Sequence, residues 1–114
     1  MTDAEVDQTL RALADPTRRR VVDLLRKEPR RAGDLAAALS ISPPRLSRHL
    51  RVLRQSGLIE EGCVEHDARI SMYLLRPERF LGLRGWLEEV ETFWLGPIDR
   101  HSHPGSAIKD GLPD

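Results

Sequence analysis

The chain has 114 residues, enough for one small domain, and its formal net charge at pH 7 is zero. Hydrophobic residues make up 39% and charged residues 32%, an ordinary globular composition. No apolar run approaches the ~18 residues of a membrane span, and no basic segment followed by an apolar one opens the chain. We therefore expect a cytoplasmic protein without a membrane partner, and the single cysteine, Cys63, excludes an internal disulfide.

The zero net charge hides an uneven distribution along the chain. Residues 11–54 hold twelve basic side chains against four acidic ones, and the remaining residues carry the opposite excess. Of the 18 basic residues, 16 are arginines, whose planar guanidinium groups suit bidentate contact with phosphate. A basic block and an acidic block in one small domain indicate a polar molecule with a binding face.

Two helices are predicted at the start of the chain. The first covers residues 3–14, with Asp3 as its cap, and the second runs from Pro16 to about residue 27 with Asp15 as its cap. The apolar stripe of the first helix consists of Val6, Leu10, Leu13 and Ala14. The apolar stripe of the second helix consists of Val21, Val22, Leu24 and Leu25.

Three consecutive arginines lie near the start of the second predicted helix, where cations oppose the helix dipole. We expect acids such as Asp15 and Asp23 to compensate Arg19. At least one of Arg18 and Arg20 should face solvent or an anionic partner.

A short helix over residues 32–39, a turn at Ser40-Ile41 and a basic helix over residues 43–56 predict a helix-turn-helix. Ser42 is a good cap for the basic helix and Pro43 fits its first position. Gly57 stands where a C-terminal cap is wanted.

The basic helix has two different faces. Leu46, Leu50 and Leu53 recur at helical spacing and predict a face buried in a core. The other sides predict contact with the DNA major groove, which the second helix of such a motif enters. The candidate residues are Arg45, Ser47, Arg48, His49, Arg51 and Arg54, with Arg20 and Arg69 at the periphery. A solvated arginine face is the simpler alternative, and His49 is equally consistent with burial against the core.

A two-stranded hairpin is predicted directly after the basic helix. Residues 58–65 and 69–75 are rich in strand-forming side chains, and residues 66–68 turn between them. This hairpin, or wing, completes a mainly α winged helix-turn-helix of about five helices and two strands. The wing carries Glu60, Glu61, Glu65 and Asp67 against Arg69 alone. Because phosphates repel carboxylates, we expect little DNA contact from the wing apart from Arg69 and His66.

The last predicted helix, residues 77–95, has more apolar surface than a terminal helix of a small domain needs. Phe80, Leu83, Leu87, Val90 and Trp94 form a heptad-like stripe. We expect a two-fold dimer, which would place two basic helices about one DNA turn (~34 Å) apart. The expected interface residues are Val6, Leu10, Leu83, Leu87, Val90 and Trp94. Packing within one protomer is the alternative.

The domain is thus expected to cover residues 1–95. Residues 96–114, rich in Gly, Pro, Ser, His and Asp, are expected to form a flexible tail.

With these elements in order, the chain resembles the ArsR/SmtB family of bacterial winged-helix repressors. The resemblance rests on Ala12-Leu13-Ala14-Asp15-Pro16-Thr17-Arg18-Arg19, Gly33-Asp34-Leu35-Ala36, Ser47-Arg48-His49-Leu50-Arg51-Val52-Leu53, Gly57-Leu58-Ile59 and Tyr73-x-Leu75-x-Pro77. It implies a homodimer that binds double-stranded DNA at an operator and represses transcription. It also implies that Ser47, Arg48 and His49 lie near DNA.

Members of this family that sense metal through cysteines hold it on the helix before the turn. Residues 33–39 of this chain contain neither Cys nor His, so we expect no metal and no cofactor there. A metal- or redox-responsive sensor using Asp99, His101 and His103, or Cys63, remains an alternative function.

A winged helix used only for protein contact is another alternative, and the acidic wing favours it. An enzyme is not expected, because no catalytic triad, phosphate-binding loop or carboxylate-pair motif stands out.

Overall fold

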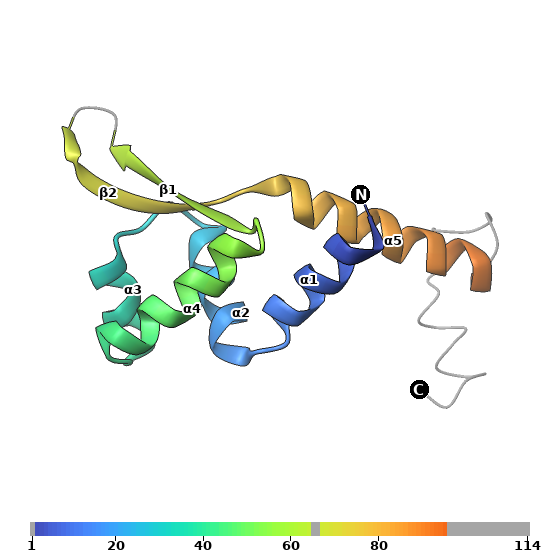
Figure 1. Ribbon diagram of the computed structural model, residues 1–114, viewed down its shortest axis with the longest axis horizontal. Coiled ribbons are helices and arrows are strands. Elements are labelled where there is room, and N and C mark those ends of the chain that lie inside the picture. Colours follow the sequence, from blue (N-terminus) through green and yellow to red (C-terminus); the bar gives the residue numbers. More distant parts are fainter. Residues whose placement is uncertain (1, 65–66, 96–114) are drawn as a thin grey trace. The chain divides into compact units, whose positions relative to one another are not determined.

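The computed structural model describes residues 2–64 and 67–95, without the side chains of residues 64, 67–70 and 95. The elements are α1 (Asp3–Leu13), α2 (Pro16–Leu25), α3 (Ala32–Leu39), α4 (Pro43–Gln55), β1 (Ile59–Val64), β2 (Asp67–Leu75) and α5 (Pro77–Leu95) (Figure 1). Five helices and one two-stranded antiparallel sheet confirm the predicted winged helix-turn-helix. The chain divides into two compact units, Met1–Leu83 and Arg84–Asp114, so the end of α5 belongs to the second unit.

The helix starts follow from side chains that accept the free amides of the first turn. The side chains of Asp15 and Ser42 accept from the backbone amides of Arg18 and Arg45, which confirms both predicted caps. The predicted cap of α1 was wrong by one residue, because Thr2 and not Asp3 occupies that position. Thr2 and Glu5 form a reciprocal capping box, in which each side chain accepts the other's backbone N–H at 3.1 Å.

The turn of the helix-turn-helix lies at Ser40, which has a left-handed backbone with φ of 55° and ends α3. The backbone N–H of Ile41 donates to the carbonyl of Ala36 (3.1 Å), and α4 begins two residues later. At the other end of α4, Gly57 has φ of 76°, the conformation that a glycine after a helix adopts without strain.

One hydrophobic core holds α4 in place. Leu46, Leu50 and Leu53 are 2%, 3% and 0% exposed, which confirms the predicted buried face. They pack in a cluster with other buried residues of α1, α2, α3 and the start of the wing: Ala12, Val21, Leu25, Leu35, Ala36, Leu39, Leu58 and Ile59. Val22 and Leu24, expected in this core, are only partly buried against it. The buried leucines therefore fix which side of α4 faces solvent.

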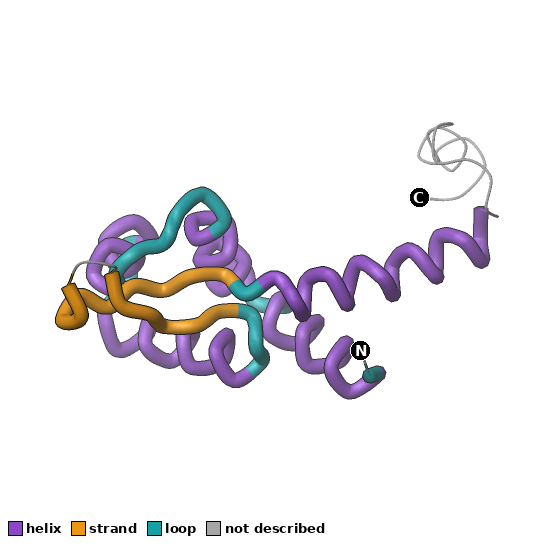
Figure 2. Tube along the Cα trace, turned by 90° about the horizontal axis from the view of Figure 1, so that it is seen from above, coloured by secondary structure: helices purple, strands orange, loops and turns teal. Residues whose placement is uncertain are grey.

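The wing follows α4 after a short turn, and its two strands run side by side in Figure 2. The register pairs Ile59 with Leu75 and Glu61 with Tyr73. The predicted strand ends shift slightly: β1 begins at Ile59 and β2 already at Asp67, whereas residues 65 and 66 lie outside the described residues.

A third segment pairs with the wing and was not predicted. Arg30, between α2 and α3, forms an antiparallel bridge with Tyr73, in which Tyr73 N–H donates to Arg30 O at 2.7 Å and Arg30 N–H donates to Tyr73 O at 3.1 Å. This bridge ties β2 to the segment that enters the helix-turn-helix.

The second unit contains the C-terminal part of α5 up to Leu95. Several of its large apolar side chains are exposed: Trp86 by 39%, Leu87 by 51%, Val90 by 38%, Phe93 by 84% and Trp94 by 71%. The rings of Phe93 and Trp94 pack edge to face, with their centroids 6.2 Å apart. Among the described residues, no helix is long and apolar enough to cross a membrane.

Candidate nucleic-acid interface

The solvent-facing side of α4 carries cations that the rest of the protein leaves available. The side chains of Arg45, Ser47, Arg48 and Arg51 are exposed. Within the described residues, the guanidinium groups of Arg45, Arg48 and Arg51 form no ion pair and no hydrogen bond with protein atoms. We call the exposed set Arg45, Ser47, Arg48 and Arg51 the α4 arginine face.

Arg54, the last arginine of α4, differs from the others because it has a carboxylate partner. Its Nη1 lies 3.1 Å from Glu61 Oε1, and the hydroxyl of Ser71 donates to the other oxygen of Glu61. This exposed network links α4 to both strands of the wing. Partial burial, and then the negative charge of Glu61, raise the pKa of the neighbouring Tyr73 hydroxyl.

Several arginines of the basic block donate hydrogen bonds to backbone carbonyls at helix ends. Arg19 Nη1 donates to the carbonyl of Leu13 (2.7 Å), so the prediction that acids compensate Arg19 was wrong. Asp23 instead pairs with Arg26 at 3.4 Å. Arg30 Nε donates to the carbonyl of Leu24 (3.3 Å) near the end of α2. Positive groups at the C-terminal ends of helices complement the helix dipole. Part of the excess of basic residues in the segment 11–54 therefore stabilises helix ends.

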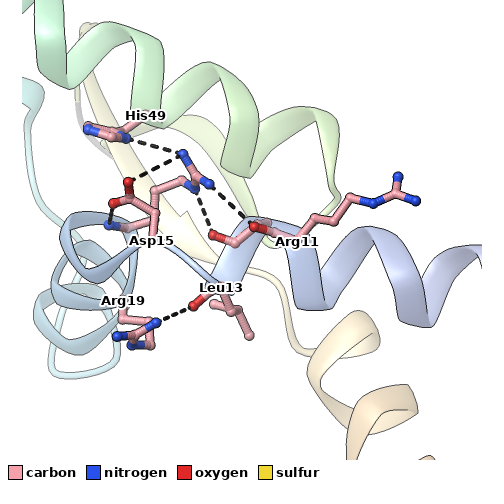
Figure 3. Close-up of polar contacts among 7 residues, drawn as sticks. Arg11, Leu13, Asp15, Arg19 and His49 are labelled. Atoms are coloured by element: carbon pink, nitrogen blue, oxygen red, sulfur yellow. Dashed lines mark hydrogen bonds and ion pairs between the residues drawn. The ribbon is translucent and has the colours of Figure 1, made fainter.

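Arg18 also reaches back to the last turn of α1, and it touches α4 as well. Its Nε donates to Ala12 O (2.7 Å) and its Nη2 to Arg11 O (3.3 Å). Its Nη1 lies 3.4 Å from His49 Nδ1 and 4.0 Å from Asp15 Oδ2 (Figure 3). His49 is half-buried, so it stands between the two alternatives that the sequence left open.

The carboxylate of Asp15 is stabilised in its charged form at this junction. The backbone N–H of Arg18 donates to Asp15 Oδ1 at 3.0 Å and holds the pKa of Asp15 below its usual value. Partial burial opposes this shift, and the positive charge of Arg18 adds to it. Asp15 therefore caps α2 and partly neutralises the cations around it.

The peripheral candidates are less well defined. The side chain of Arg20 is exposed on α2 and has no ion-pair partner within the described part of the chain. Arg69 belongs to β2, but its side chain lies outside the described residues, as does all of His66.

Most residues of the alternative metal site lie outside the part of the chain that the structure describes. Asp99, His101 and His103 lie beyond the described residues, and Cys63 is exposed on β1. Within residues 2–64 and 67–95, no group of three or more His, Cys, Asp or Glu side chains is placed to hold a metal ion.

A leucine-anchored second helix with exposed, unpaired arginines, followed by a wing, defines a winged helix-turn-helix DNA-binding protein. Residues 15–61 match the family described as "Bacterial regulatory protein, arsR family". This segment runs from the cap of α2 into β1 and includes the whole helix-turn-helix.

Known proteins extend this similarity over more of the chain. The transcriptional repressor SdpR of Bacillus subtilis (strain 168) is 39% identical over 56 residues, which cover 49% of this chain and 62%, less than two thirds, of SdpR. The HTH-type transcriptional regulator Rv2034 of Mycobacterium tuberculosis (strain ATCC 25618 / H37Rv) is 35% identical over 88 residues, covering 77% of each chain. The solved ArsR-like transcriptional regulator from Rhodococcus sp. RHA1 superposes with a TM-score of 0.70 at 26% identity, covering 94% of this chain and 92% of the other.

The chain therefore belongs to the arsR family of bacterial regulatory proteins. It is a DNA-binding transcriptional regulator, and the predicted family resemblance is confirmed.

Proposed function

We propose that the protein is a homodimeric repressor that binds a near-palindromic operator by inserting α4 into the major groove. The observation that carries this proposal is the α4 arginine face, whose guanidinium groups are exposed and unpaired within the described residues. Leaving several cations unpaired on one helix is electrostatically unfavourable in the free protein. DNA phosphates and guanine edges are the partners that fit this arrangement. The protein acts, in this proposal, by binding and not by catalysis.

The residues of α4 divide into three proposed roles. Arg45, Arg48 and Arg51 contact phosphates or base edges, and Ser47 contributes a hydroxyl that serves either. Arg54 contacts DNA less directly, because Glu61 already occupies its guanidinium group. His49 contributes through the half-buried ring that contacts Arg18. Arg20 and Arg69 are assigned to phosphates at the edge of the site.

The dimer is supported by the exposed apolar stripe of α5. Leu87, Val90 and Trp94 are 51%, 38% and 71% exposed in the protomer, and such a surface on a small protein usually meets a partner. Leu83 is half-buried, and Leu10 of α1 is 42% exposed. Val6 is only 8% exposed, so it contributes less to the proposed interface than expected from the sequence.

Repression, as opposed to activation, is the part of the proposal taken from a relative. SdpR is named a transcriptional repressor, and its matched segment covers 49% of this chain. A bound dimer also represses by simple occupancy of a promoter, which needs no further contact with the transcription machinery.

Selection of bound duplexes from a random DNA pool tests the proposal. We expect two inverted half-sites about 10 base pairs apart, centre to centre, because a two-fold dimer places its α4 helices on one side of the duplex. Affinity for the selected DNA should fall steeply with added salt as counterions are released. A pool that yields no enriched sequence, or a single half-site bound by one protomer, would contradict the proposal.

A further inference from the structure

Arg18 makes contacts that set it apart from the arginines of the proposed DNA interface. Its guanidinium group reaches the carbonyls of Ala12 (2.7 Å) and Arg11 (3.3 Å), the ring of His49 (3.4 Å) and the carboxylate of Asp15 (4.0 Å). Its side chain is 18% exposed. Figure 3 shows His49, from α4, and Asp15, from the start of α2, both next to the same nitrogen of this group, Nη1. The group is thus directed into the protein at a junction of three helices.

The contact with His49 has a defined direction. A guanidinium group carries only donors, so Nδ1 of His49 is the acceptor and the proton of the neutral ring is on Nε2. The orientation of the imidazole is therefore tied to Arg18. Since His49 lies between Arg48 and Leu50, the same contact acts on the part of α4 that carries the arginine face.

A second contact joins α1 and α4 at the other end of the pair. Gln8 Nε2 of α1 donates to the backbone carbonyl of Gln55, the last residue of α4, at 3.4 Å. Gln8 is itself held by Arg79, whose Nη1 donates to Gln8 Oε1 at 3.1 Å. The helices α1 and α4 are thus connected twice. Arg18 of α2 bridges the last turn of α1 to His49, and Gln8 in the middle of α1 contacts the end of α4.

We infer that Arg18 is a positioning residue for DNA binding, and the inference rests on the function proposed above. Arg18 joins the last turn of α1 to His49 and thereby sets the position of the α4 arginine face, without touching DNA itself. A positive charge alone is not enough for this role, because the role needs a planar fork of donors that reaches two carbonyls and the imidazole at once.

The salt dependence of DNA affinity separates a positioning residue from a phosphate contact. The variants are Arg18→Gln, Arg18→Lys, which keeps the charge but loses the fork, and Arg20→Gln as the matched control on the same helix. Loss of a phosphate contact lowers the slope of log affinity against log salt by about one per contact. Loss of positioning lowers affinity at every salt concentration with the same slope.

We expect Arg18→Gln and Arg18→Lys each to weaken binding to the selected operator by about tenfold with the wild-type slope, since each loses hydrogen bonds of a charged group. Arg20→Gln should lower the slope. If Arg18→Lys binds like the wild type, or if Arg18→Gln lowers the slope by about one per protomer, Arg18 is a direct phosphate contact and the inference is overturned.

A spectroscopic measurement keeps the test independent of the folding of any variant. The ¹⁵N chemical shifts of the His49 ring in the wild-type protein at about pH 8.5, where an imidazole is neutral, should show an unprotonated Nδ1 and a protonated Nε2. The opposite tautomer would overturn the inference. A wild-type protein that binds no DNA in a salt-dependent way would instead overturn the proposed function.

Discussion

Asp15 shows how much a single side chain does at the start of α2. Its carboxylate accepts the Arg18 backbone N–H and also lies beside the Arg18 guanidinium group and His49. The sequence predicted the cap correctly, because Asp-Pro before a helical pattern is a local signal. It did not predict the charged cluster, because His49 is 34 positions further along the chain and only the tertiary fold brings it near.

The lowered pKa of Asp15 makes a prediction about stability in acid. A carboxyl whose pKa is lower in the folded state stabilises the protein above its unfolded pKa, and this contribution is lost as pH falls through the folded pKa. In Asp15→Asn the cap remains but the charge is lost. We expect Asp15→Asn to be less stable than the wild type at pH 7 by roughly 0.5–1 kcal/mol, because the site is partly exposed.

The free energy of unfolding by urea, measured from pH 7 down to about pH 2.5, checks this prediction. The difference between the two proteins should stay constant down to about pH 5 and should shrink at lower pH. A difference that does not change with pH would show that the Asp15 charge contributes nothing to stability.

Arg19 and Thr2 mark what a residue-level interpretation of the sequence missed. Arg19 was expected to pair with an acid, but it donates to Leu13 O, because a backbone carbonyl at a helix end is also a strong acceptor. Thr2 caps α1 in place of Asp3 because the Thr-x-x-Glu spacing satisfies two amides at once. The partner of Arg19 is a backbone carbonyl, which carries no sequence signal, whereas the Thr-x-x-Glu spacing at the start of α1 is a sequence signal that the prediction missed.

At the scale of elements, α4 was the most predictable part of the chain. The spacing of Leu46, Leu50 and Leu53, the Ser42 cap and Gly57 all agreed, and the structure confirms each of them. The bridge between Arg30 and Tyr73 was not predictable. It pairs a single residue from each of the two segments, and no run of strand-forming residues surrounds Arg30. Long-range pairing of this kind depends on how the elements pack and not on local pattern.

The buried face of α4 gives a prediction about the stability of the whole domain. Leu53 is 0% exposed within the core cluster, so Leu53→Ala removes buried apolar surface and leaves a cavity. We expect a loss of about 2–5 kcal/mol in the free energy of unfolding. Gln55→Ala, an exposed position on the same helix, is the control and should change stability by less than about 0.5 kcal/mol.

Urea denaturation of both variants measures these differences, with unchanged m-values showing that the transition stays two-state. Equal stabilities of Leu53→Ala and Gln55→Ala would mean that the leucine stripe does not anchor α4.

At the scale of the whole molecule, the proposed dimer depends on the stripe of α5. Leu87→Asp places a carboxylate in the centre of this stripe, where burying an unpaired charge is costly. Leu81→Asp is the matched control, since Leu81 is similarly exposed (58% against 51%) but lies outside the stripe. Sedimentation velocity at micromolar concentration should show a dimer for the wild type and for Leu81→Asp, and a monomer for Leu87→Asp. A monomeric wild type would contradict the proposed assembly.

The distribution of charge gives the molecule its proposed binding face, although the net charge is zero. Part of the basic block caps helices, through Arg18, Arg19 and Arg30. What remains exposed and unpaired on α4 is the face assigned to DNA. The sequence could locate the basic block, but only the structure separates the arginines that serve the fold from those that are available.

The most direct test of this account compares two double charge reversals. Arg48→Glu/Arg51→Glu alters the α4 arginine face, and Arg26→Glu/Arg76→Glu changes the net charge equally at exposed arginines that already have acidic partners. Affinity for the selected operator is measured at one salt concentration for both. We expect the first variant to lose affinity by a factor on the order of 100 or more, and the second to lose far less. Equal losses in the two variants would show that only net charge matters, and would contradict the assignment of α4 as the DNA-reading helix.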